Sequence, residues 1–204
     1  MVLQAYLAGP DVFLPHPREH AQRKIAICAR YGIVGRTPLN EDIERSSGMS
    51  DEAFAFAIFR KDVAMMRACD IMIANLTPFR GASADSGTLV ELGWFLGRGR
   101  PIFAYSNAAT PFAQRSRMQV EALPDPQPDI VVEGFGLPDN LMIPGAVLAG
   151  GGHPMVLPDD GKDHAFDALD VFERCVAAVS RHLGSEALER RQAALVEGVG
   201  FEPT

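Results

Sequence analysis

The sequence lacks any apolar run near the roughly 20 residues that a membrane-spanning helix needs. Its first ten residues also lack the basic start and the long apolar core of a secretory signal peptide, so we expect a cytoplasmic protein. Only three cysteines are present, and their wide spacing fits neither a disulfide framework nor a zinc site. Cys28, Cys69 and Cys175 are therefore predicted to be buried reduced thiols, and no metal is expected.

Basic residues are also few, with 19 Lys and Arg against 26 Asp and Glu and a net charge of -7 over 204 residues. A nucleic-acid partner requires a concentrated basic face, whereas the arginines here are scattered. We expect neither a nucleic acid nor a membrane as partner, and a nucleotide-like ligand would be small. The hydrophobic content of 47% is sufficient for a large core. The chain length and this hydrophobic content predict one α/β domain over residues 1–184, followed by a helical extension or tail over 185–204.

Two carboxylates six residues apart, Asp85 and Glu91, stand at a predicted loop-to-helix junction. The segments 70–76 and 101–105 have the composition of short buried strands, so the helix between them forms a βαβ crossover. Such units place their active face at the carboxyl ends of the strands. This makes the junction the expected chemical centre of the protein.

A helical wheel that starts at Thr88 places Glu91 on the shoulder of an apolar arc, which predicts a half-buried carboxylate. The alternative interpretation is that Asp85 or Ser86 only caps the helix and that Glu91 only favours the helix dipole.

The remaining pattern predicts further elements of an α/β fold. Strands are expected at 2–8, 33–35 and 130–132, and helices at 16–31, from Ser50 or Asp51 to 69, and at 164–183. Between them lie a polar loop at 36–50, a short helix or excursion at 106–128, and a loop rich in glycine and proline at 134–152.

Asp62 is the strongest anomaly of the predicted helix that ends at residue 69. It falls inside an apolar arc formed by Phe54, Ala55, Ile58, Phe59, Met65, Met66 and Cys69. An aspartate in a core costs several kcal/mol unless it is paired, hydrogen-bonded or protonated, so Asp62 is expected to line a polar pocket. The alternative is a structural bond to a nearby loop. Asp62, Asp85 and Glu91 are predicted to converge on one cleft.

Two aromatic residues lie near that cleft in the predicted fold. Tyr6 and Phe13 are placed to flank a planar ring, although an aromatic at a strand end is also typical of a core.

Five segments carry a resemblance to a known family. They are Tyr-Leu-Ala-Gly-Pro-Asp-Val-Phe at 6–13, Asp62, Ala-Asn-Leu-Thr-Pro-Phe-Arg-Gly at 74–81, the stretch 85–93, and Val-Glu-Gly-Phe-Gly-Leu-Pro-Asp-Asn-Leu-Met at 132–142. In this order and spacing, over roughly residues 2–183, they closely resemble the nucleoside 2-deoxyribosyltransferase family. The resemblance implies a flavodoxin-like (Rossmann-like), doubly wound parallel sheet flanked by helices. It also implies cofactor-free transfer of 2-deoxyribose between nucleobases, a pentosyltransferase reaction of nucleotide salvage.

The resemblance also implies roles for individual residues. Glu91 would be the nucleophile that forms a covalent deoxyribosyl-enzyme, which gives ping-pong kinetics. Asp85 would hold sugar hydroxyls or assist proton transfer, and Asp62 would be the acid/base that faces the nucleobase. The matching substrate-binding positions are Tyr6, Gly9, Asp11, Phe13, Asn75, Gly87, Asp139 and Asn140. Asp139 and Asn140 match a pair that reaches into the neighbouring subunit, which implies a homo-oligomer with shared active sites.

Two alternative functions remain open at the level of sequence. One is a related hydrolase, a 2-deoxynucleoside 5'-monophosphate N-glycosidase, in which Arg80 or Ser86 would bind the phosphate. The other is a nucleotide-binding sensor without catalysis, which has no evident need for three carboxylates. The segment 106–128 and the tail beyond 183 are longer than small members of the family need.

Overall fold

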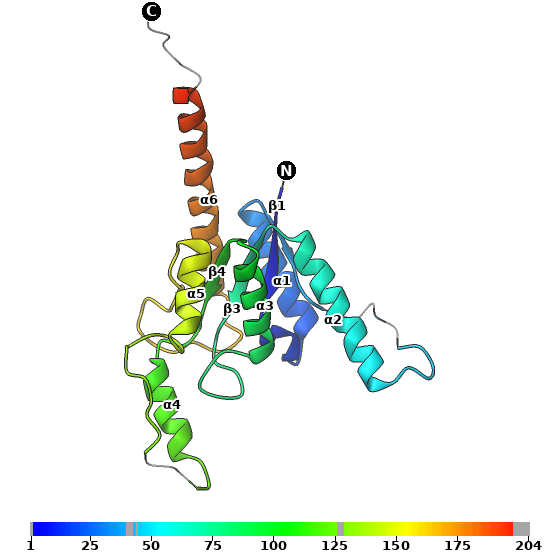
Figure 1. The fold of residues 1–204 in the computed structure, drawn as a ribbon, viewed down its shortest axis with the longest axis vertical. Helices are drawn as coiled ribbons and strands as arrows, with labels where there is room; N and C mark the ends of the chain where they lie inside the picture. The colour runs from blue at the N-terminus through cyan, green and yellow to red at the C-terminus, as the bar shows by residue number, and fades with distance from the viewer. Residues whose placement is uncertain (1, 40–42, 44, 126–128, 198–204) are drawn as a thin grey trace, which may run out of the picture.

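We describe a computed structural model that covers residues 2–39, 43, 45–125 and 129–197, with side chains as far as residue 184. Within these residues four parallel strands form one sheet in the order β2-β1-β3-β4 (Figure 1). Their bounds are Leu3–Ala8 for β1, Ile33–Arg36 for β2, Ile71–Asn75 for β3 and Ile102–Tyr105 for β4. The predicted parallel α/β fold is confirmed.

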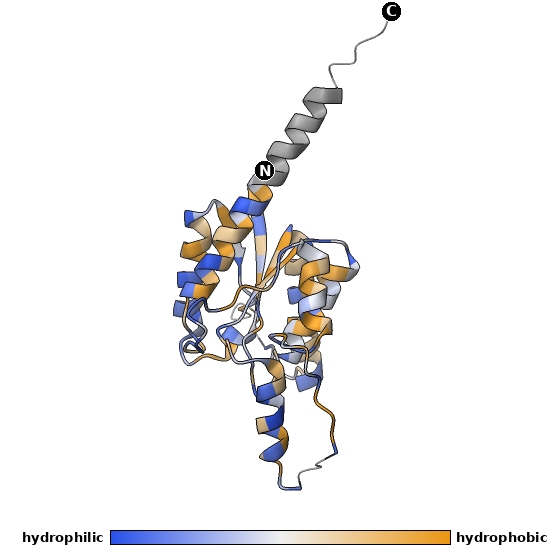
Figure 2. Ribbon diagram, turned by 90° about the vertical axis from the view of Figure 1, so that its left-hand side faces the viewer, coloured by the Kyte–Doolittle hydropathy of each residue, from blue (hydrophilic) through white to orange (hydrophobic). Residues whose placement is uncertain are grey.

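Helices cover both faces of the sheet because its central strands are apolar on both sides. The bounds are Pro17–Arg30 for α1, Asp51–Ala68 for α2, Ser86–Gly97 for α3, Phe112–Glu121 for α4, Met142–Gly151 for α5 and Asp170–Glu197 for α6. One face packs against α1 and α6, and the other against α2, α3 and α5. Figure 2 shows the hydrophobic strands between these two layers of helices. In Figure 1, α4 lies beyond the carboxyl ends of the strands, and α6 extends past the opposite end.

The strand order determines where a ligand site is expected. From β1 the chain goes to β2 on one side of the sheet, and β3 and β4 then add on the other side of β1. In doubly wound sheets ligands bind at this reversal, outside the carboxyl ends of the two central strands. The loops after β1 and β3 therefore form the expected site.

The strand predicted at 130–132 is absent, because this segment has no sheet neighbour and Val131 is 92% exposed. A later residue lies at the sheet edge instead. Val156 forms an isolated parallel bridge with Tyr105, donating its amide to Ala104 O at 2.9 Å and accepting from Ser106 N at 2.9 Å. It occupies the position where a fifth strand would begin.

The last helix begins at Asp170 rather than near His164. Asn107 explains the difference, because its side-chain amide donates to the carbonyls of Ala165, Phe166 and Ala168, each at 3.0 Å. These carbonyls are therefore held in a loop instead of a first helical turn.

The glycine-rich segment 134–152 contains α5, a helix that we predicted as a loop. Gly150 and Gly151, at the end of this helix, serve packing rather than flexibility. A Cβ added at Gly151 would lie 2.0 Å from Ile102 O, so only a glycine lets α5 approach β4 this closely.

The apolar arc predicted for α2 is correct only in part. Met66 and Cys69 are buried, but Ala55 is exposed and Phe59 is 56% exposed. Phe54 and Ile58 are partly buried and face a cavity described below.

Three further expectations concern the whole chain. Cys28, Cys69 and Cys175 are buried free thiols, as predicted. Among the described residues, no helix is long and apolar enough to cross a membrane. The backbone of α6 continues without a break from residue 184 to residue 197, and the rest of the extension or tail predicted over 185–204 lies outside the described residues.

Candidate active site

The loop after β1 forms one side of the candidate site. Gly9 ends the strand with φ 150°, and the short 3-10 helix η1 (Pro10–Phe13) follows directly. A Cβ at Gly9 would lie 2.7 Å from both Asn75 Cβ and Asp11 Oδ2, so this turn packs tightly against the end of β3. Glycine is therefore required at this position.

The amino end of α3 forms the opposite side. Asp85 is the N-cap, and its Oδ2 accepts from Thr88 N at 3.1 Å and from Thr88 Oγ1 at 3.3 Å. The capping interpretation of Asp85 is therefore correct. The cap also holds the Asp85 carboxylate at the mouth of the cavity that contains Glu91.

Glu91 lies in the second turn of α3 and is half-buried, as the helical wheel predicted. The hydroxyl of Tyr6, a fully buried residue of β1, donates to Glu91 Oε1 at 2.5 Å. Tyr6 is therefore part of the core and also a direct partner of the candidate nucleophile. This contact joins a strand and a helix that are 85 positions apart in the sequence.

The environment of Glu91 favours its protonated form. Burial raises the pKa of Glu91 to about 7, the Tyr6 hydrogen bond opposes this rise, and the charges of Asp62 and Asp85 add to it. Burial and the nearby Glu91 carboxylate raise the pKa of Tyr6 far above its ordinary value, so Tyr6 remains a donor. Near neutral pH Glu91 is therefore divided between its ionised and neutral forms.

The three predicted acids line one cavity of about 580 Å³, which we call the acidic cleft. Asp62 comes from α2, and Asp85 and Glu91 from α3. The other lining residues are Gly9, Val12, Phe13, Pro17, Pro38, Leu39, Phe54, Ile58, Gly87 and Thr88. An acidic floor and an apolar wall therefore face the same volume, which suits a ligand with a polar and a planar part.

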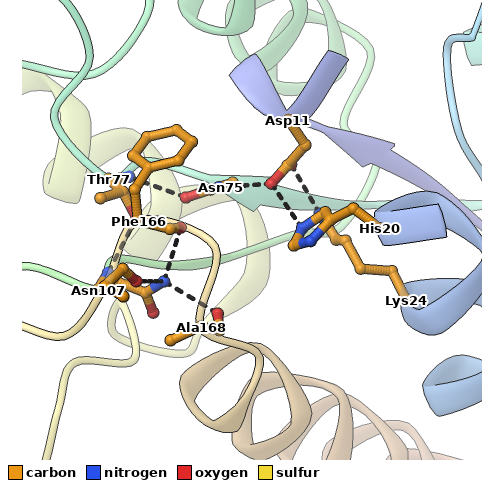
Figure 3. A network of polar contacts seen from close by, with 9 residues as sticks. Asp11, His20, Lys24, Asn75, Thr77, Asn107, Phe166 and Ala168 are labelled. Atoms are coloured by element: carbon orange, nitrogen blue, oxygen red, sulfur yellow. Dashed lines mark hydrogen bonds and ion pairs between the residues drawn. The ribbon is translucent and has the colours of Figure 1, made fainter. Parts of the chain in front are cut away.

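The predicted substrate-binding residues divide into several groups. Gly9, Phe13 and Gly87 line the acidic cleft. Tyr6 lies beneath it, bonded to Glu91. Asp11 and Asn75 belong to a polar network behind the cleft, which Figure 3 shows.

Asp139 and Asn140 do not line the acidic cleft. The Asp139 carboxylate is buried and accepts from Ser83 Oγ at 2.5 Å, Ala84 N at 3.0 Å and Asn140 N at 2.8 Å. Asn140 lines a second cavity, of about 800 Å³, which we call the large cavity. Asp85 lines both cavities, so they adjoin at the amino end of α3.

Sequence reasoning missed most of the apolar wall of the cleft. Pro38 and Leu39 come from the polar loop after β2, and Phe54 and Ile58 were assigned to the core. For Phe54 and Ile58 the available signal was their spacing from Asp62 along α2, because positions three or four residues apart share a helix face.

Among the described residues, no group of three or more His, Cys, Asp or Glu side chains is arranged to hold a metal ion. What the cleft offers is a half-buried carboxylate with two further carboxylates beside it. Such sets of carboxylates act at anomeric carbons, where one attacks and another manages the proton of the leaving group.

Comparison with known proteins gives the family and the fold of the chain. The sequence profile described as nucleoside 2-deoxyribosyltransferase matches residues 5–142, which is more than half of the chain. A solved 2-desoxiribosyltransferase from Leishmania mexicana is 30% identical, with a TM-score of 0.58 over 88% of this chain and 98% of that one. A conserved protein from Enterococcus faecalis V583 is 17% identical, with a TM-score of 0.52 over 87% of this chain and 99% of that one, and shows the fold alone.

A curated relative, the uncharacterized protein C191.05c of Schizosaccharomyces pombe, is 31% identical over 115 residues. The match covers 55% of this chain and 54% of the yeast protein, so it spans about half the length of that relative. The profile match, together with the strand order, supports one conclusion. The chain belongs to the nucleoside 2-deoxyribosyltransferase family.

Proposed function

We propose that this protein transfers 2-deoxyribose from one nucleobase to another through a covalent ester on Glu91. The observation that carries the proposal is the placement of Glu91, half-buried in the acidic cleft and bonded to the Tyr6 hydroxyl at 2.5 Å. A buried carboxylate held by one strong donor has a fixed oxygen to present to a bound sugar. The name of the Leishmania relative agrees with this reaction class.

In the first step Glu91 attacks the anomeric carbon of a bound deoxynucleoside. The bond from this carbon to the nucleobase nitrogen breaks, and its electron pair leaves with the base. Asp62, which lines the same cleft, donates a proton to the departing base. The products are a deoxyribosyl ester of Glu91 and a neutral free base.

The second step reverses the first with another base. A nitrogen of the incoming base attacks the anomeric carbon, the ester bond breaks, and Glu91 recovers its charge. Asp62 takes the proton that the attacking nitrogen loses. No redox change occurs, and we propose that no cofactor takes part.

We assign the sugar to the acidic floor and the base to the apolar wall. The hydrogen bond from Thr88 N holds the Asp85 carboxylate where it reaches a sugar hydroxyl. Phe13, Leu39 and Phe54 are suited to contact a planar base, and Gly9 and Gly87 leave room for the substrate.

The resemblance implies that Asp139 and Asn140 both reach a neighbouring cleft, and we propose a homo-oligomer in which Asn140 does so. Asp139 contributes indirectly, because its bonds to Ser83 and Ala84 fix the loop that leads to Asp85. Three buried free cysteines support a cytoplasmic location.

A specific observation keeps one hydrolytic alternative in view. Arg80 and Ser86 line the large cavity, which meets the cleft at Asp85, so a 5'-phosphate of a longer substrate would find a cation there. The sugar would then pass to water, as in a 2-deoxynucleoside 5'-monophosphate N-glycosidase.

One incubation separates these functions. The purified protein is mixed with a deoxynucleoside and a different free base, and the products are separated by chromatography. A new deoxynucleoside supports the transferase. A parallel incubation replaces the deoxynucleoside by its 5'-monophosphate. Release of 2-deoxyribose 5-phosphate and free base from the monophosphate, faster than release of deoxyribose from the deoxynucleoside, supports the hydrolase instead. Binding of the deoxynucleoside without turnover contradicts both enzymatic functions and supports a sensor.

A further inference from the structure

Behind the cleft lies a buried cation that the chemistry above does not use. Lys24 of α1 is only 1% exposed, and its Nζ lies 2.9 Å from Asp11 Oδ2. The same Nζ stands 4.7 Å from the ring centroid of Phe172 and 5.6 Å from that of Tyr105. Within the described residues, Asp11 is the only carboxylate bonded to Lys24. A buried ammonium needs such a partner, so Asp11 and Lys24 depend on each other.

Asp11 is held from two further directions. Its Oδ1 lies 3.1 Å from His20 Nε2 and accepts from Asn75 Nδ2 at 3.0 Å. Burial by itself would raise the pKa of Asp11, but Lys24 and His20 outweigh this effect and hold the pKa well below its ordinary value. The ionised form of Asp11 is therefore favoured, and both of its carboxylate oxygens are engaged.

The network continues across the ends of β3 and β4. Asn75 Oδ1 accepts from Thr77 N at 3.0 Å, and Thr77 Oγ1 accepts from Asn107 N at 2.9 Å. The Asn107 amide then holds the loop at 165–168 through three carbonyls. Figure 3 shows this polar row, which runs from Lys24 to that loop across three strand ends.

An aromatic row joins the same three segments. Phe13 stacks on Phe79 with centroids 5.5 Å apart, and Phe79 lies 5.8 Å from Phe166. Phe13 follows Asp11 by two positions, Phe79 follows Thr77 by two, and Phe166 provides a carbonyl to Asn107. Polar and aromatic contacts therefore fix the same loops relative to one another.

The short helix η1 connects this network to the cleft. Gly9, Val12 and Phe13 line the acidic cleft, whereas the Asp11 carboxylate bonds to α1 and to β3. The position of the cleft wall therefore depends on a residue that is directed away from it.

We propose that Asp11, paired with buried Lys24 and bonded to Asn75, is a positioning residue that sets the η1 wall of the acidic cleft without contacting substrate. The proposal rests on the proposed transferase function. It assigns to Asp11 and Asn75 a role in substrate affinity through Val12 and Phe13. Chemistry at Glu91 proceeds independently of them, because the groups that shift the pKa of Glu91 are Tyr6, Asp62 and Asp85.

The test compares Asp11→Asn with the double variant Asp11→Asn/Lys24→Met. The single variant leaves Lys24 buried without a counter-charge, and the double variant removes both charges. Asp160→Asn is the matched control, because Asp160 also pairs with a histidine, His164 at 3.1 Å, but on an exposed loop outside the cleft. The readouts are KM and kcat for base exchange, the pH profile, and hydrogen exchange of the amides at 11–14 without ligand.

For Asp11→Asn we expect KM to rise about 10-fold, kcat to change less than about 3-fold, and the pH profile to stay in place. The amides at 11–14 exchange faster, including that of Leu14, which donates to Asp11 O at 3.1 Å. The double variant recovers KM to within about 3-fold of wild type and restores slow exchange. Asp160→Asn behaves as wild type.

An unchanged KM in folded Asp11→Asn overturns the proposal, as does a shifted pH profile or a double variant that recovers nothing. If Asp11→Asn does not fold, Asn75→Ala takes its place, because it removes the amide that donates to Asp11 Oδ1 at 3.0 Å without removing a charge and without changing a residue that lines the cleft. A raised KM in Asn75→Ala supports the proposal, and a wild-type KM overturns it. If the wild-type enzyme exchanges no bases, the proposed function fails, and hydrogen exchange alone decides the role of Asp11.

Discussion

Removal of the Tyr6 hydroxyl tests how this site prepares its nucleophile. In Tyr6→Phe the ring and its burial remain, but the donor 2.5 Å from Glu91 Oε1 is lost. A hydrogen bond to an ionised group contributes about 1.5–3 kcal/mol, and 1.36 kcal/mol corresponds to one pKa unit. The pKa of Glu91, which is about 7 in the wild-type protein, should therefore rise to about 8–9.

The effect on rate follows from the fraction of ionised Glu91. At pH 7 this fraction falls from about one half to about one in 30 when the pKa is about 8.5, so kcat/KM falls about 15-fold. The assay is base exchange measured from pH 5 to 9.5. The ascending limb of kcat/KM should move upward by about one to two pH units, with the loss shrinking as the pH rises.

Tyr31→Phe is the control, because Tyr31 also donates to a glutamate, Glu173 at 3.3 Å, on the sheet face opposite the cleft. Its profile should match that of wild type. An ascending limb that stays in place in Tyr6→Phe, or moves to lower pH, would refute the assigned role of the hydroxyl.

Three further predictions concern the acids and the assembly. The pKa of Glu91 is about 7 in the folded protein and 4.5 in the unfolded chain, so the fold loses stability as the pH rises between these values and Glu91 ionises. Glu91→Gln avoids this loss and should be more stable than wild type by up to about 3 kcal/mol at pH 8 but not at pH 4. Denaturant midpoints at the two pH values measure this, and equal differences at both contradict the burial argument. Asp62→Asn should exchange bases of ordinary deoxynucleosides poorly but retain activity on 7-methyl-2'-deoxyguanosine, whose cationic base leaves without a proton. Equal losses of activity on ordinary deoxynucleosides and on the methylated one would contradict the acid role of Asp62. Inactive Glu91→Ala subunits mixed with inactive Asn140→Ala subunits should regain about a quarter of wild-type activity after random exchange into dimers. If the subunits are shown to exchange and no activity returns, the loop that carries Asn140 serves its own chain.

Periodicity was sufficient to place the acids. Glu91 on the shoulder of α3 and Asp62 within the arc of α2 followed from the 3.6-residue repeat, and both line the cleft. The parallel strands were also predictable, since short apolar runs alternated with helical patterns.

Contacts between distant segments were not predictable in the same way. The bond from Tyr6 to Glu91 requires β1 and α3 to pack in one register, which no local pattern specifies. Lys24 is a charged residue in a helix and would be expected at the surface, yet it is buried because Asp11 neutralises it. Gly151 was assigned to a loop, although its missing side chain is required by close packing of α5 on Ile102. In each case a tertiary partner reversed the local expectation.

The most direct test of the account is to trap the sugar on its nucleophile. The protein is incubated with a deoxynucleoside that carries fluorine on the sugar, which slows release of the glycosyl-enzyme, and is analysed by intact-protein and peptide mass spectrometry. We expect one sugar adduct per chain, located on Glu91, with release of the free base and no adduct in Glu91→Gln. An adduct on another residue, or a Glu91→Gln enzyme that still exchanges bases, would contradict the role of Glu91 as the nucleophile.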